Sequence, residues 1–242
     1  DIPTQEQVDA FLPPYEPRQV LDPTDPISIG AMVGPEAFME VRYLAHAKQL
    51  QALELIPQYA AEFKQKFGRD SGGLVRTYRT EDAETIIVAM GSVLGTIKDV
   101  VDDMRAQGHK IGVLGIISFR PFPMQQAREA LQHCQRFVVV EKNLAVGLGG
   151  VLYTTLRMAV AGLKLTGYTA IAGLGGRPIP KSSLHKLFID AEQGALEPVT
   201  FVDLDWDVVN KQLEREKQNR HSGPIAENIL HAKGMSSSAK FG

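Results

Sequence analysis

Thr85-Ile-Ile-Val-Ala-Met90 is a continuous apolar run, rich in β-branched residues. Such a run is typical of a strand buried on both faces of a parallel sheet. Similar runs follow at Ile111–Phe119, Phe137–Val140 and Tyr168–Ala172. The intervals between and after them have apolar residues at helical spacing, over residues 93–107, 124–133, 148–161 and 182–192. This alternation predicts βαβ crossovers and therefore an α/β fold, a three-layer α/β/α architecture with a mostly parallel sheet.

The segments outside this α/β domain, which we place at residues 71–208, differ in composition. Residues 1–35 hold seven of the 14 prolines, which remove backbone donors and favour an extended linker or arm. Residues 36–70 predict a helical linker, formed by one kinked helix or two short ones because Pro57 interrupts the pattern. Residues 209–242 predict a polar tail, a surface helix followed by an extended arm.

The overall composition excludes several classes of protein. The net charge of -2 comes from interspersed acids and bases, without the basic stripe that binds nucleic acid. No run approaches the roughly 20 apolar residues of a membrane span. The single cysteine, Cys134, cannot close an intramolecular disulfide or supply a cluster or zinc site alone. We therefore expect a cytoplasmic protein.

Two glycine-rich loops each follow a predicted strand and precede a helix. The first contains Gly147, Gly149 and Gly150, and the second contains Gly175 and Gly176. Bare backbone amides at such a place can hold an anion, but neither loop completes a dinucleotide fingerprint and neither precedes a P-loop lysine. Tight-turn and subunit-contact roles compete with a ligand role. The loops are therefore candidates for either an interface or a ligand.

Charged residues at predicted strand ends are further candidates. Glu141 and its neighbour Lys142 end the third core strand, where open α/β sheets place their ligands, although an ion-paired strand end has the same pattern. Arg120 begins the sequence Arg-Pro-Phe-Pro, which predicts a rigid strand exit or an anchor for a carboxylate of a neighbouring subunit. Arg177, directly after the second glycine loop, joins the same group of interface or ligand candidates.

No residue pattern indicates catalysis or metal binding by this chain. The side chains of His133 and Cys134 are adjacent in sequence and diverge on a helix, so they do not form a nucleophile–base pair. The other histidines lack metal-ligand spacing, and no serine lies in a GxSxG elbow. We predict no catalytic, cofactor-binding or metal-binding residue.

Five motifs occur in the order in which they appear in one enzyme family. They are Asp25-Pro-Ile-Ser-Ile-Gly30, Gly34-Pro-Glu-Ala-Phe-Met-Glu-Val-Arg-Tyr43, Val88-Ala-Met-Gly-Ser92, Phe119-Arg-Pro-Phe-Pro123 and Ala172-Gly-Leu-Gly-Gly-Arg177. Over residues 20–190 the chain resembles the α subunit of pyruvate and related 2-oxoacid:ferredoxin oxidoreductases. The resemblance is to the linker and second domain of that subunit, a domain similar to the transketolase C-terminal domain.

The resemblance implies an enzyme that decarboxylates a 2-oxoacid on thiamine diphosphate, passes electrons to iron–sulfur clusters and transfers the acyl group to coenzyme A. It implies that the catalytic glutamate lies in a first domain preceding Asp1, with the Mg- and diphosphate-binding motif and the cluster cysteines in other domains or subunits. No cofactor is expected in this chain. The implied partners are that first domain, the thiamine-binding β subunit, a γ subunit, a ferredoxin-like cluster subunit, and a ferredoxin or NAD-linked acceptor.

Two alternatives stay open at this point. An arylglyoxylate dehydrogenase subunit, with NAD as the final acceptor, has the same sequence features, so the 2-oxoacid is undetermined. A stand-alone α/β module that binds a nucleotide or an acyl carrier through the glycine loops is a hypothesis of another class. The proline-rich arm favours the enzyme subunit, because an arm without its own core gives an independent module no advantage.

Overall fold

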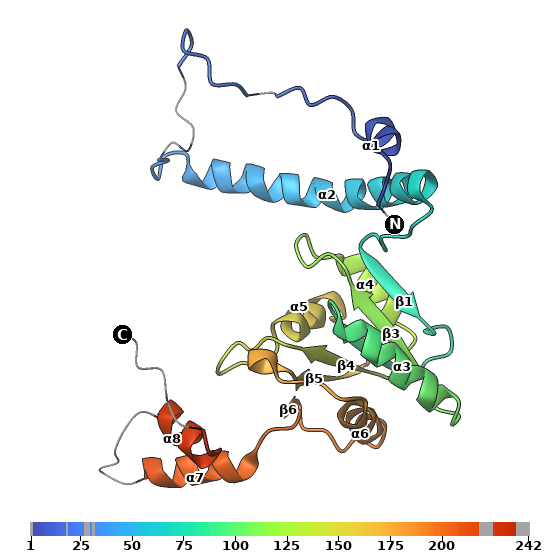
Figure 1. Cartoon of the computed structure of the whole chain (residues 1–242), viewed down its shortest axis with the longest axis vertical. Coiled ribbons are helices and arrows are strands. Elements are labelled where there is room, and N and C mark those ends of the chain that lie inside the picture. The colour runs from blue at the N-terminus through green and yellow to red at the C-terminus, as the bar shows by residue number, and fades with distance from the viewer. Residues whose placement is uncertain (1, 18, 27–29, 31, 218–224, 236–242) are drawn as a thin grey trace. The chain divides into compact units, whose positions relative to one another are not determined.

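A computed structural model of the chain describes residues 2–17, 19–26, 30, 32–217 and 225–235 (Figure 1). It divides into two compact units, Asp1–Thr200 and Phe201–Gly242. The sequence motif at 25–30 lies partly outside the described residues, as do parts of the predicted tail.

A six-stranded sheet with the order β1-β3-β2-β4-β5-β6 organises the larger unit. Strands β3, β2, β4 and β5 pair in parallel, and β1 adds an antiparallel edge to β3. A row of paired residues crosses the middle of the sheet through Leu114, Val88, Val139 and Thr169. The strands are β1 Val75–Tyr78, β2 Thr85–Ala89, β3 Ile111–Ile116, β4 Arg136–Glu141, β5 Thr166–Ile171 and β6 Val199–Phe201.

Helices cover both faces of the sheet. Helix α3 packs beside α6, and α4 packs beside α5 on the other side (Figure 1). Because they are covered from both sides, every residue of β2 and β3 is buried, as is β4 from Phe137 to Glu141. This confirms the predicted α/β/α layering and mostly parallel sheet. The helices are α3 Val93–Arg105, α4 Met124–Leu131, α5 Val151–Ala159 and α6 Lys181–Glu192, with a 3-10 turn η1 at Leu174–Gly176.

Two element boundaries of the α/β domain differ by three residues from the sequence prediction, and the others differ by less. The helix expected from residue 148 begins at Val151, because Ala145 and Gly149 pair in a tight loop that holds the preceding residues. The strand expected to reach Phe119 ends at Ile116, where the chain leaves the sheet toward Pro123. Both differences place irregular backbone at the carboxyl edge of the sheet.

The predicted N-terminal arm contains a helix, α1, at Gln5–Phe11. Thr4 and Gln7 close its first turn as a capping box. The ring of Phe11 lies 5.9 Å from that of Phe63 and 5.3 Å from that of Phe67 in helix α2. The arm is therefore anchored by an aromatic contact, which the proline count did not reveal.

The predicted helical linker is one helix, α2, that runs from Phe38 to Phe67 through Pro57. Gly68 ends it in a left-handed conformation with φ 67°, which glycine adopts without steric cost.

In its described residues, the smaller unit contains α7, Trp206–Glu216, and α8, Ile225–Ala232. Helix α7 is the predicted surface helix, and it starts before residue 209 because the Asp205 side chain accepts a hydrogen bond from the Val208 amide. Helix α8 occupies a segment where we expected an extended arm. Residues 218–224 and 236–242 lie outside the described part of the chain.

Candidate functional site

The carboxyl ends of β2 and β4 form the switch point of the sheet. The connection after β2 passes through α3 to β3, whereas the connection after β4 passes through α5 to β5 on the opposite side. Open α/β sheets bind ligands in the crevice where connections diverge in this way. A cavity of about 240 Å³ opens there, and its lining is mainly apolar: Met90, Val93, Phe119, Val140, Val151, Leu152 and Ile179. Glu141, Lys142 and Asn143 complete the lining.

The carboxylate of Glu141 is hydrogen-bonded to other groups of the same protein. The residue is 7% exposed. Its carboxylate accepts hydrogen bonds from the amides of Leu152 at 2.8 Å and Tyr153 at 3.2 Å, and from the hydroxyl of Thr169 at 3.1 Å. The two amides belong to the first turn of α5. The N-cap residue of this helix is Gly150, which has no side chain that could cap it. Glu141 thus supplies the negative charge that a helix N-terminus favours.

The first glycine loop is shaped around this carboxylate. A Cβ atom on Gly150 would lie 1.8 Å from Glu141 Oε1 and 2.3 Å from Thr169 Oγ1. Gly147 and Gly149 have φ values of 84° and 123°, and the Ala145 amide donates to the Gly149 carbonyl at 2.8 Å. The glycines therefore permit a tight turn and a close approach to a side chain of the same protein. A carboxylate stands where a nucleotide-binding loop places a phosphate.

The second glycine loop lies at the same edge, after β5. Gly173, Gly175 and Gly176 have φ values of 71°, 67° and 85°. A Cβ on Gly175 or Gly176 would meet no atom within 4 Å, so their glycine identity follows from backbone conformation and not from close packing. Gly175, Gly176 and Arg177 are exposed, and only Ile179, further along, reaches the cavity.

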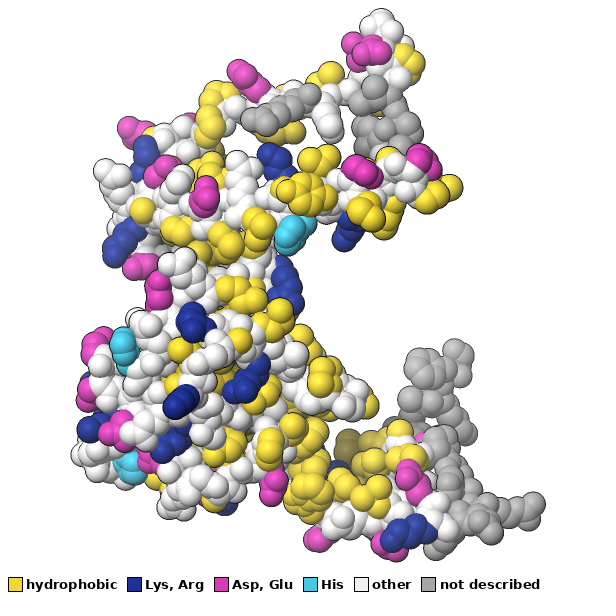
Figure 2. All heavy atoms as spheres, turned by 180° about the vertical axis from the view of Figure 1, so that it is seen from behind, with side chains coloured by type: hydrophobic (Ala, Val, Ile, Leu, Met, Phe, Trp, Pro, Cys, Tyr) yellow, Lys and Arg dark blue, Asp and Glu magenta, His cyan; other side chains and the backbone are white. Residues whose placement is uncertain are grey.

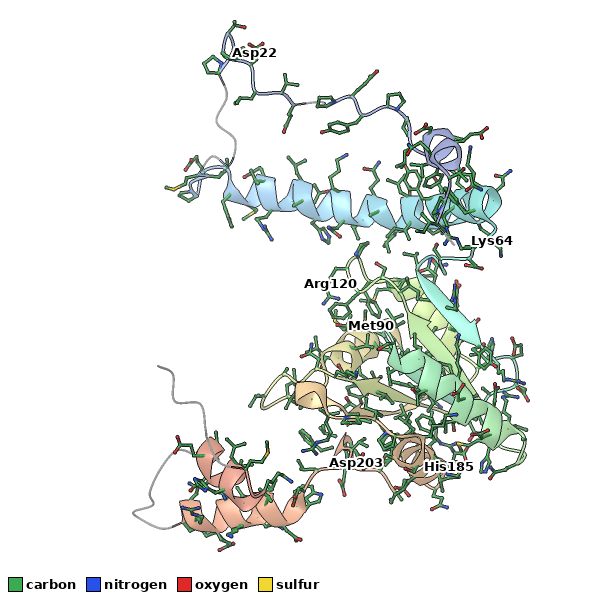
Figure 3. The ribbon with its side chains drawn as sticks, viewed as in Figure 1. Asp22, Lys64, Met90, Arg120, His185 and Asp203 are labelled. Carbon is green, nitrogen blue, oxygen red and sulfur yellow. The ribbon has the colours of Figure 1, made fainter. Side chains whose placement is uncertain are left out.

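Arg120 stands on the loop that follows β3 (Figure 3). Its guanidinium lies 4.1 Å from the centroid of the Phe119 ring and donates to the Phe119 carbonyl at 2.6 Å. The Ser118 hydroxyl donates to the Pro121 carbonyl at 2.8 Å, and Phe122 is buried. The loop is therefore a rigid exit that presents an exposed arginine, pre-oriented by the ring beneath it.

Large apolar side chains extend into solvent at this edge, a feature that the sequence reasoning missed. Val146 is 91% exposed and Leu148 is 66% exposed in the first glycine loop, and Ile117 and Leu174 are exposed in the loops after β3 and β5. The available signal was a valine and a leucine on either side of Gly147, a glycine that the backbone conformation requires. Several exposed apolar side chains at one edge of a sheet are typical of an interface.

Residues 83–184, which contain all of these loops, match the family model described as pyruvate:ferredoxin oxidoreductase core domain II. The chain is 42% identical over 209 residues to pyruvate synthase subunit PorA of Methanosarcina barkeri, covering 83% of this chain and 52% of PorA. The chain belongs to the 2-oxoacid:ferredoxin oxidoreductase family. The predicted resemblance to its α subunit is confirmed.

Another relative is named for a different acid. Ketoisovalerate oxidoreductase subunit VorA of Pyrococcus horikoshii is 36% identical over 176 residues, which is 72% of this chain and 45% of VorA. A solved 2-oxoglutarate:ferredoxin oxidoreductase from Magnetococcus marinus aligns with a TM-score of 0.41 and 20% identity, over 53% of this chain and 21% of that chain. The chain spans about half the length of the curated relatives it matches.

The remaining sequence candidates lie away from this edge. Cys134 is buried, and its thiol donates to the Leu131 carbonyl at 3.1 Å. Burial raises the pKa of the Cys134 thiol to about 11, so the thiol is neutral at physiological pH. In the described part of the chain, no three His, Cys, Asp or Glu side chains are placed to hold a metal ion. Among the same residues, no helix has the length and apolar character to cross a membrane.

Proposed function

We propose that this chain is the part of an α subunit that supports assembly and active-site architecture in a thiamine-diphosphate-dependent 2-oxoacid:ferredoxin oxidoreductase. The whole enzyme would convert pyruvate or a related 2-oxoacid to an acyl-CoA, in the cytoplasm. The observation that carries the supporting role is the carboxylate of Glu141, which accepts hydrogen bonds from the N-terminal amides of α5, where a ligand anion would otherwise bind. Catalysis is then assigned to domains and subunits other than this α/β domain.

The residues of this chain do not fit the cofactors of the family. A cluster needs several thiolates, and the one cysteine is buried with its thiol directed at a backbone carbonyl. Thiamine diphosphate carries a diphosphate group, which a helix N-terminus can bind. The N-terminal amides of α5 are not available for it because they already donate hydrogen bonds to Glu141. Thiamine diphosphate, Mg and the clusters are therefore assigned to the β subunit, the first domain and the cluster subunit. No reaction step is assigned to this chain.

The same carboxylate argues against the stand-alone nucleotide-binding module. A phosphate approaching the α5 amides would meet a buried negative charge and two donors that are already paired. An arylglyoxylate enzyme with NAD as final acceptor is a variant within the family. Its substrate, like the choice between pyruvate and a branched-chain acid, depends on residues outside this chain.

Affinity purification of the tagged full chain from its native cells tests the proposal. We expect thiamine-binding and cluster-rich subunits to co-purify, and the complex to reduce a viologen dye with pyruvate, ketoisovalerate or an arylglyoxylate, whichever is the substrate. Deletion of 2–35 or of 209–242 should reduce recovery of the partners more than it lowers the melting temperature of the α/β domain. Recovery of the chain without such partners, from cells that make them, would contradict the proposal.

A substitution of Arg120 tests the same supporting role. If its pre-oriented guanidinium binds a partner carboxylate, Arg120→Ala costs about 2 kcal/mol of association, roughly 30-fold in Kd. The matched control is Arg157→Ala, an exposed arginine in the last turn of α5. Equal Kd values for both variants, measured by titration of the partner subunits, would remove Arg120 from the interface.

A further inference from the structure

Helix α2 is apolar on more than one side and has no buried residue. Its 30 residues extend about 45 Å, longer than a small domain is wide. One apolar stripe consists of half-buried side chains: Leu53, Ile56, Ala60, Phe63 and Phe67. A second stripe, rotated by about 100° from the first, consists of exposed side chains: Val41, Leu44, Leu55 and Tyr59. We call the second one the outer stripe.

The contacts between α1 and α2 do not cover the outer stripe. Helix α1 places Phe11 against Phe63 and Phe67, and Lys66 donates to the Ala10 carbonyl at 2.8 Å. All these contacts are at the C-terminal end of α2. In the outer stripe, Leu44 remains 63% exposed and Leu55 37% exposed. Hydrophobic side chains are visible along the α2 segment in Figure 2.

A helix that is apolar around most of its circumference is normally buried. An exposed stripe of this kind marks an interaction surface. The matching part of PorA is 52% of its length, so about half of that relative has no counterpart in this chain. The matched α/β domain is numbered core domain II in its family. A further folded domain in the α subunits of this family is therefore the natural partner for the uncovered helix.

We propose that the outer stripe of α2 is the docking face for the folded domain contained in the half of the α-subunit relatives that this chain does not span. This inference rests on the proposed function and adds a specific surface to it. The partner surface is apolar and has a hydrogen-bond acceptor opposite Lys48. Lys48 lies in the middle of the stripe and donates to Gln51 on the same helix at 3.1 Å, so its ammonium group remains at the surface.

Lys48 also argues against a second copy of this chain as the occupant. A twofold interface pairs each surface with itself. Because Lys48 lies near the centre of the outer stripe, an antiparallel pair of α2 helices would bring two ammonium groups together near the axis. Like charges at the centre of an interface are strongly unfavourable. A domain with an acceptor at that position has no such penalty.

Site-specific photo-crosslinking in the purified complete complex tests the assignment. A benzophenone amino acid is placed at Leu44 or Leu55, with Glu54 as the control. Glu54 directly precedes Leu55, so its side chain points about 100° away around the helix, on the polar side of α2. We expect Leu44 and Leu55 to crosslink to peptides from the other half of the α subunit, at least tenfold more than Glu54 does. Crosslinks into residues 71–200, into a second copy or into another subunit, or no crosslinks, would overturn the inference.

Hydrogen exchange gives a second measurement that requires no substitution. Peptides covering residues 39–59 should exchange at least tenfold more slowly in the complex than in the isolated chain, because docking protects α2. Equal rates would also refute the docking face. Failure of the proposed function is distinguishable from either result, because it appears earlier, as the absence of thiamine-binding and cluster-bearing subunits from the purified material.

Discussion

Replacing Glu141 with alanine tests the idea that this carboxylate is an internal anion for helix α5. The change leaves two backbone amides and the Thr169 hydroxyl without their acceptor in a buried site. Each unsatisfied buried donor costs about 1–3 kcal/mol, and loss of the helix-dipole interaction costs up to about 2 kcal/mol. Water from the adjoining cavity offsets part of this, so we expect a loss of about 3 kcal/mol in the free energy of unfolding.

The assay is urea unfolding followed by far-ultraviolet circular dichroism. Fluorescence is unsuitable because the single tryptophan, Trp206, lies in the smaller unit. Glu141→Gln keeps an acceptor and loses the charge, so it should cost about half as much, since charge-assisted hydrogen bonds are roughly twice as strong. Lys142→Ala, at the next position, is the matched control and should change stability by less than about 0.5 kcal/mol.

A ligand experiment sharpens the same prediction. Removal of the carboxylate vacates an anion site at the helix N-terminus, so inorganic phosphate should stabilise Glu141→Ala in a concentration-dependent way and leave the parent chain unaffected. If the alanine variant unfolds within 0.5 kcal/mol of the Lys142 control and phosphate has equal effects on both, the reasoning about this site is refuted.

Further predictions concern Gly150, Cys134 and Phe11. Gly150→Ala should destabilise the α/β domain by about 2 kcal/mol or more because its Cβ overlaps Glu141, whereas Gly95→Ala in open space within α3 should be neutral or stabilising, as measured by urea unfolding. Cys134 should react with a thiol reagent at pH 8 about 100-fold more slowly in the folded chain than when unfolded, and similar rates would show that the thiol is accessible. Because the pKa of its thiol is raised to about 11 by burial, the stability from keeping it neutral is present below pH 9.0 and should be lost as the pH rises toward 11. Phe11→Ala should release α1 and increase proteolysis near residue 11 without changing the unfolding of the α/β domain, and unchanged proteolysis would mean that the aromatic contact does not hold the arm.

The sequence by itself determined the layered α/β fold and the family. Strands such as β2 and β3 are buried on both faces, so their apolar runs are nearly continuous and identify them without knowledge of their neighbours. The motif order placed the chain in its family because short motifs in a fixed order are far more specific than any one motif alone.

Only the tertiary structure decided the chemistry of the switch point. Glu141 and Leu152 are 11 residues apart and Thr169 is 28 residues from Glu141, so their hydrogen bonds depend on how α5 packs against β4 and β5. From the sequence, Glu141 could form an ion pair or contact a ligand. In the folded protein its carboxylate caps the N-terminus of α5. The anchoring of α1 on α2 was equally hidden, because Phe11 and Phe67 meet across a segment whose prolines predict extension alone. Local patterns specify strands and helices through the backbone, whereas the role of a polar or aromatic side chain is set by residues that reach it from elsewhere in the fold.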